Sequence, residues 1–149
     1  MDDKAARSRA ALLLAVQPTT IVENAFYRVE ALVGATVARV VRSDRSFSAL
    51  DDVRTSCGAV QRALDGLGRA SRSLLVDSRL APITPAPAAV EQAFAKERVD
   101  MIRGFRRAAI LVASAAGKLH VERLLREDAA FAHSRAFVHE VDALVFLVG

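Results

Sequence analysis

The chain has 149 residues, of which 26% are charged, and its formal net charge is +4. This length predicts a single domain whose core is large enough to be stable without a disulfide or a metal. The sequence also argues against a transmembrane helix, because no apolar run approaches the roughly 20 residues that a span requires.

The distribution of charge argues against a nucleic-acid-binding protein. The cations are mostly arginines and alternate with Asp and Glu along the chain, and there is no Trp and only one Tyr. Nucleic-acid binding usually requires a basic stripe with aromatic stacking platforms. The single cysteine, Cys57, cannot pair within the chain, which favours a reducing, cytoplasmic setting.

Residues 1–18 form an N-terminal segment that we expect to be helical or disordered. Lys4–Arg9 followed by the apolar run Ala10–Val16 imitates the start of a signal peptide. The acidic Asp2 and Asp3 and the shortness of the apolar run argue against that interpretation. Residues 19–149 are then expected to form one α/β domain.

The domain is predicted to begin with strands and one helix. Thr20–Val22, Phe26–Val33 and Thr36–Arg42 are rich in β-branched and aromatic residues, and Gly34-Ala35 fits a tight hairpin. Ser48 and Asp51 predict a capping box at the start of a helix that ends at Gly66 and Gly68. The apolar stripe of this helix contains Leu50, Val53, Cys57, Val60, Leu64 and Leu67.

Leu74–Val76 are predicted to form a central strand, because the run is short and apolar on both faces. It ends in the corner Asp77-Ser78-Arg79. The loop that follows contains prolines at 82, 85 and 87, which exclude regular structure before Ala88.

Two more helices, two more strands and a short final helical segment are predicted in the remainder of the chain. One helix contains Val90, Phe94 and Phe105 and is broken toward its end by Gly104, with Arg106 and Arg107 at its C-terminus, where cations are favourable. A buried strand over 108–113 follows, and Ser114 caps a helix that runs to residue 131 with His120 at the rim of its apolar side. The chain closes with a strand over 135–138 and a final helical turn or two through 142–147.

This order of elements predicts an α/β fold with a mixed β-sheet, a leading antiparallel hairpin and about four helices. Residues 25–147 resemble the STAS superfamily, the anti-sigma-factor-antagonist fold, and in particular its small stand-alone bacterial members. The resemblance depends on four segments, which read RSLLVDSR, GFRRAAILVAS, AAGKLHVERLLRED and FVHEVDALVFL.

The resemblance implies a cytoplasmic regulatory domain that docks a bacterial signalling or structural protein. In antagonist members, a serine after the central strand is phosphorylated and the added charge breaks the complex. This chain has Ser78-Arg79-Leu80 at that place, without the glycine and second hydroxyl of the family pattern. Ser78 is therefore interpreted as a turn former, and Ser78, Thr84 and Ser114 are retained as phosphorylation candidates.

A protein partner, or a second copy of the chain in a homodimer, is expected to bind through the loop Leu80–Pro87 and the outer faces of the helices that begin at Ala88 and Ala115. Lys118, Glu122 and Arg126 predict a row of ion pairs on this helix, with the apolar Leu119 among them. The candidate partner-binding residues are Asp77, Ser78, Arg79, Ile83, Thr84, Ser114, Lys118, Leu119 and Arg126.

Neither an enzyme nor a metal or cofactor protein is expected. The three histidines form no H-x-x-x-H pair, Cys-x-x-Cys is absent, and the glycines form no phosphate-binding loop. A Ser-His-Asp set from Ser78, His120 and Asp77 can be written for almost any chain that has these residues. The alternative function is a carrier that holds a small apolar ligand or lipid between sheet and helices.

Overall fold

A six-stranded mixed sheet forms the centre of the fold. The computed structural model describes residues 2–32 and 36–149. The strands follow one another across the sheet in chain order, and the first three are antiparallel while β3 to β6 are parallel. They are β1 (Pro18–Glu23), β2 (Tyr27–Leu32), β3 (Val37–Arg42), β4 (Ser73–Asp77), β5 (Ala108–Leu111) and β6 (Ser134–Phe137). The predicted α/β class with a leading antiparallel segment is confirmed.

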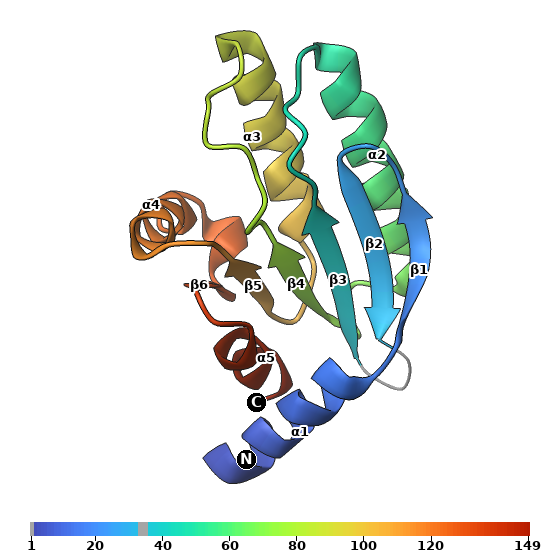
Figure 1. Cartoon of the computed structure of the whole chain (residues 1–149), viewed down its shortest axis with the longest axis vertical. Coiled ribbons are helices and arrows are strands. Elements are labelled where there is room, and N and C mark those ends of the chain that lie inside the picture. Colours follow the sequence, from blue (N-terminus) through green and yellow to red (C-terminus); the bar gives the residue numbers. More distant parts are fainter. Residues whose placement is uncertain (1, 33–35) are drawn as a thin grey trace.

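Helices cover both faces of the sheet. Within the described residues there are five α-helices rather than about four, together with the short 3-10 helix η1 (Ala129–Phe131). The α-helices are α1 (Asp3–Ala15), α2 (Leu50–Leu67), α3 (Ala88–Ile102), α4 (Ala115–Leu125) and α5 (Glu140–Val148). The helices α2 and α3 pack on one face, and α1 and α5 pack on the other (Figure 1).

The central strand β4 separates two hydrophobic cores, as its double-sided apolar sequence predicts. Leu74 and Val76 face the larger core under α2 and α3, whereas Leu75 faces the smaller core under α1 and α5. All five residues of β4 are buried. The N-terminal segment contributes to the smaller core, because α1 buries Ala10 there against α5.

The start of α2 differs from the predicted capping box. Ala49 is the N-cap residue and provides no side-chain cap. The hydroxyl of Ser48 instead donates to Asp52 Oδ2 at 3.0 Å, so the prediction of a pair with Asp51 was wrong by one residue. Gly66 lies inside the helix, and Gly68, with φ of 86°, ends it.

The end of α3 was predicted in part: the break near Gly104 is confirmed, but Phe105 and the two arginines after it were placed wrongly. The helix stops at Ile102, and Gly104, with φ of 89°, turns the chain so that Phe105 lies outside the helix. Arg106 and Arg107 therefore lead into β5 instead of lying at the C-terminus of α3. Arg107 Nη1 donates to the carbonyl of Phe146 at 2.7 Å, so its cation is placed at the end of α5.

Two further expectations are corrected at α4, and a third lies outside the described residues. The helix ends at Leu125 and not at residue 131, because Asp128 accepts from the Ala130 N–H and caps η1 separately. His120 is exposed and not at the rim of a core. The predicted Gly34-Ala35 hairpin turn lies outside the described residues.

The thiol of Cys57 is expected to be unreactive in the folded protein. Cys57 is buried in α2, and burial raises the pKa of its thiol to about 11. At pH 8 almost no thiolate is then present, and a reagent has no access. Titration with a chromogenic thiol reagent should give about one thiol per chain in denaturant and far slower labelling in its absence. Equally rapid labelling in both conditions would contradict the buried position.

Candidate functional site

The corner predicted as the docking edge contains a buried carboxylate held by two arginines. Asp77 is the last residue of β4 and its side chain is buried. Arg39 on β3 donates to Asp77 Oδ2 at 3.0 Å, and Arg79 donates to the same oxygen at 2.8 Å and to Oδ1 at 3.0 Å. Asp77 thus fixes the start of the loop that follows it.

A second carboxylate closes this network from α5. Glu140 Oε1 lies 2.8 Å from Arg39 Nη1, and Glu140 Oε2 lies 3.6 Å from Arg79 Nη2. Two arginines and two carboxylates from β3, β4, the following loop and α5 therefore form a neutral cluster. We call Arg39, Asp77, Arg79 and Glu140 the corner network.

The arginines decide the charge state of Asp77. Burial alone raises the pKa of this carboxyl, but hydrogen bonds and charge from Arg79, together with the hydrogen bond from Arg39, outweigh burial and hold the pKa below its ordinary value. The hydrogen bond to Asp77 in turn raises the pKa of Arg79. Both groups are charged at neutral pH, so the network acts as a fixed electrostatic clamp.

Ser78 is a turn residue, as predicted. Its N–H donates to the carbonyl of Leu111 at 2.8 Å, and its carbonyl accepts from the Ala81 N–H at 3.1 Å. The first bond ties the end of β4 to the end of β5, and the second begins the turn. The backbone of Ser78 therefore has a structural role.

The loop from Leu80 to Pro87 presents apolar side chains to solvent. Ile83 is 98% exposed and Leu80 is 63% exposed. The neighbouring Thr84 is exposed as well. The far end of the loop is fixed where the Ala86 N–H donates to Glu91 Oε1 of α3 at 2.9 Å. The loop is thus held at both ends while Ile83 projects from its middle.

The N-terminus of α4 lies at the same edge of the sheet, since it follows the neighbouring parallel strand β5. Ser114 is the N-cap residue, and its Oγ accepts from the Gly117 N–H at 3.0 Å. Lys118 forms the predicted ion pair with Glu122, at 3.9 Å. Leu119 is 63% exposed, as its place among charged residues indicated.

Arg126 is separated from the other candidate residues. It caps the C-terminus of α4, which is about 16 Å from the N-terminus for a helix of this length. There it lines an open groove of about 610 Å³ between α4, η1 and β6, together with Glu122, Leu125 and Phe131. Eight of the nine predicted residues therefore lie at or after the carboxyl ends of the neighbouring strands β4 and β5, whereas Arg126 lies at the far end of α4.

Arg39 and Glu140 are the members of the corner network that sequence reasoning missed. Arg39 lies in a strand between the apolar Ala38 and Val40, and a charged residue at such a position indicates a buried partner. That pattern could have marked Arg39. Nothing local in the sequence connects Glu140 with Asp77, which lies on a different element.

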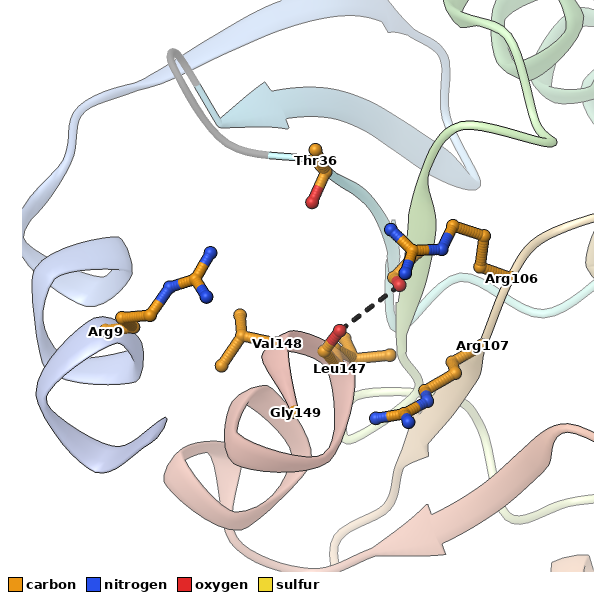
Figure 2. Close-up of a pocket in the computed structure, with 8 residues that line it drawn as sticks. Arg9, Thr36, Arg106, Arg107, Leu147, Val148 and Gly149 are labelled. Atoms are coloured by element: carbon orange, nitrogen blue, oxygen red, sulfur yellow. Dashed lines mark hydrogen bonds between the residues drawn. The ribbon is translucent and has the colours of Figure 1, made fainter. Parts of the chain in front are cut away.

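Two hollows of the described surface are polar or open. One is the groove beside Arg126, and the other, of about 360 Å³, lies between α1, α5 and the start of β4 (Figure 2). Neither is an apolar pocket between the sheet and the helices α2 and α3. In residues 2–32 and 36–149, no group of three or more His, Cys, Asp or Glu side chains is arranged to hold a metal ion.

Comparison with known proteins leaves the family open. No protein-family model matches the chain. No curated protein matches it. No solved structure matches it. No helix of the described chain has the length and apolar character that would let it cross a membrane.

Proposed function

We propose that this chain is a non-enzymatic protein-interaction module of the cytoplasm that docks a protein partner through the carboxyl edge of its parallel strands. The observation that carries the proposal is the exposed Ile83 on a loop whose two ends are fixed. Burying the apolar side chain of isoleucine is favourable, and an almost fully exposed isoleucine is buried only when another molecule covers it. We define the docking edge as Leu80, Ile83, Thr84, Ser114, Lys118 and Leu119.

The corner network supports this proposal by making the edge rigid. A loop that is ordered before binding loses less conformational entropy on association than a mobile one. Asp77, Arg79 and the turn at Ser78 hold the loop at its start, while Glu91 holds it at its end. The charged Lys118 and the apolar Leu119 add a mixed surface of the kind that protein interfaces use.

The STAS-like nature of the chain is part of this proposal. The mixed sheet with strands in chain order and helices on both faces is consistent with that resemblance. On this basis the partner is a bacterial signalling or structural protein, or a second copy of the chain. The carrier of a small apolar ligand stays the alternative, and neither of the two hollows described above lies beneath α2 or α3 as that function would require.

Replacing Ile83 by Asp is expected to abolish partner binding without destabilising the fold, because the side chain contacts almost nothing within the chain. The measurement is affinity capture with the tagged full-length chain, read by quantitative mass spectrometry. Leu12→Asp is the matched control, since Leu12 is also exposed, at 68%, but lies on α1. Proteins retained by wild type and Leu12→Asp should be lost with Ile83→Asp.

Two outcomes would overturn the docking proposal. One is an identical set of captured proteins for wild type and Ile83→Asp, together with an unchanged mass in solution by light scattering, which also covers self-association. The other is a co-purified lipid bound to a clean monomer. Phosphorylation is tested separately with Glu at Ser78, Thr84 and Ser114, and unchanged partner affinity for all three variants would reject a phosphorylation switch.

A further inference from the structure

The strand β6 has an unpaired edge. Among the described strands it is the last in the sheet and pairs only with β5 (Figure 1). The carbonyls of His133 and Phe137 accept hydrogen bonds from the β5 side, at 3.0 and 2.9 Å. Because the backbone groups of successive strand residues point to opposite sides, those of Ser134 and Ala136 point away from β5. Each of these two residues therefore directs an N–H donor and a carbonyl acceptor out of the sheet.

This edge borders the groove of about 610 Å³ beside Arg126. Ser134 and Ala136 both line the groove, and Ala136 is only 3% exposed. The outward N–H and carbonyl of Ala136 have no hydrogen-bond partner in residues 2–32 and 36–149. Buried backbone groups are nearly always paired in folded proteins, so a molecule in the groove that supplies the missing partners is favoured.

Two apolar side chains line the groove beside the edge. Leu125 of α4 and Phe131 of η1 belong to the side of the larger core and both border the groove. Phe137 packs on the other face of the sheet, so Ala136 directs its side chain toward the face of α4 and η1. A chain that pairs with β6 places alternate side chains on that face. The groove therefore fits an apolar side chain at every second position of such a chain.

The charges of the lining favour an acidic chain. Its two carboxylates already have partners, since Glu122 lies 3.9 Å from Lys118 Nζ and Asp128 accepts from a backbone N–H of η1 at 2.8 Å. Arg126 and Arg135 are exposed, and neither forms an ion pair with another residue of the described chain. A carboxylate on the occupant of the groove is attracted to these two cations.

The other edge of the sheet is protected against such pairing. The strand β1 begins with Pro18, which has no N–H, and its register shifts between Thr20 and Val22. Prolines and bulges both prevent a further strand from pairing with an edge. The strand β6 contains no proline and keeps a regular register with β5. A further strand is therefore accepted at β6 and not at β1.

We propose that an extended acidic segment of a partner protein adds to the sheet as a further strand beside β6. It exchanges hydrogen bonds with Ser134 and Ala136, covers the two apolar side chains and places carboxylates near Arg126 and Arg135. A second copy of the chain fits less well, because pairing of β6 with itself about a two-fold axis brings two Arg135 side chains near each other. The groove is separate from the docking edge, so this inference does not depend on the proposed function.

The test is the fluorescence anisotropy of a labelled synthetic hexapeptide that alternates glutamate with valine, titrated with the full-length chain. We expect saturable binding that Arg126→Glu and Arg135→Glu each weaken by about fivefold, because charge reversal turns an attraction into a repulsion. The matched control is Arg123→Glu, which lies on α4 outside the groove and should bind like wild type. Ile83→Asp should also bind normally, which distinguishes this surface from the docking edge.

Ser134→Pro tests the backbone pairing itself. It removes an N–H that points away from β5, and proline is tolerated at the first residue of a strand, so the fold should persist. We expect the peptide to bind this variant about tenfold more weakly, because a hydrogen bond is lost and the ring blocks the edge. Hydrogen exchange of wild type is a second measurement, in which the peptide should slow the Ala136 amide and leave Thr20 on β1 unchanged.

The proposal is wrong if the anisotropy shows no saturable change, or if Arg126→Glu and Arg135→Glu both bind like Arg123→Glu. Equal binding of a peptide with lysine in place of glutamate would refute the acidic occupant. A wild-type dimer in light scattering that Ser134→Pro dissociates would make a second copy the occupant instead. Circular dichroism verifies that Ser134→Pro is folded, and the charge variants with the exchange of Ala136 decide the question if it is not.

Discussion

Replacing Asp77 by alanine is expected to lower the free energy of unfolding by about 3 kcal/mol, the lower end of the cost of breaking a buried ion pair. The variant leaves Arg39 and Arg79 without the carboxylate that both contact. Glu140 still lies 2.8 Å from Arg39, which is why the loss should not reach the upper end of that range. Urea denaturation followed by circular dichroism measures the difference.

A double substitution separates the charge pair from the fold. Asp77→Leu together with Arg39→Leu replaces the more buried pair of the network by apolar side chains and leaves Arg79 and Glu140, which lie 3.6 Å apart, to compensate each other. Such replacements of buried pairs are often close to neutral. The double variant should therefore be more stable than Asp77→Ala. Glu122→Ala, which removes the exposed pair with Lys118, is the control and should cost no more than about 1 kcal/mol.

The dependence of the free energy of unfolding on pH, measured below pH 5, provides an independent test of the corner network. Because the folded-state pKa of Asp77 is lowered, its contribution is present above the unfolded-state value of about 3.9 and is lost as the pH falls through the folded-state pKa. Asp77→Asn should thus lose less stability than wild type between pH 5 and pH 2. Parallel acid curves for the two proteins would contradict the proposed clamp.

The sequence predicted those parts of the fold whose cause is local. The run Leu74–Val76 is apolar on both faces, so it could be assigned to a buried central strand. The stripe of α2 was visible for the same reason, and Val53, Cys57, Val60 and Leu64 are buried. Leu50, at the first position of that stripe, is 36% exposed because it lies at the free start of the helix.

The ends of helices were predicted less well, because several local patterns compete there. The Ser48 hydroxyl could form a hydrogen bond with Asp51 or with Asp52. In the structure Ala49 is the extended N-cap residue, and Ser48 donates to Asp52. Phe105 continued the apolar spacing of α3, yet Gly104 has a left-handed backbone conformation that ends the helical course of the chain. Phe105 therefore packs in the core from outside the helix. The spacing of apolar residues in the sequence does not reveal the backbone angles at which a helix ends.

The candidate site could be predicted in part. The corner Asp77-Ser78-Arg79 followed from its place after a buried strand, but Glu140 is 63 residues further along the chain than Asp77 and comes near it only when β4 and α5 are packed. The hollow of about 360 Å³ between α1, α5 and the start of β4 was missed altogether. Thr36 and Arg106 are distant in sequence and meet where the parallel strands begin, and α1 brings Arg9 to the same place.

The two-sided burial of β4 leads to the second large effect. Leu74→Ala and Leu75→Ala are each expected to lower the free energy of unfolding by about 2 to 5 kcal/mol, the usual cost of a cavity in a core. Both side chains are fully buried, one in the core under α2 and α3 and the other in the core under α1 and α5. Urea denaturation of the two single variants gives the comparison.

The similarity of the two losses matters more than their size. A strand with one solvent-exposed face would show a large loss at one position and a small loss at the next, because adjacent side chains point to opposite faces. The exposed Thr20→Ala on the edge strand β1 is the control and should change stability by no more than about 0.5 kcal/mol. If Leu75→Ala proved as mild as Thr20→Ala, α1 and α5 would not cover this face of the sheet in solution.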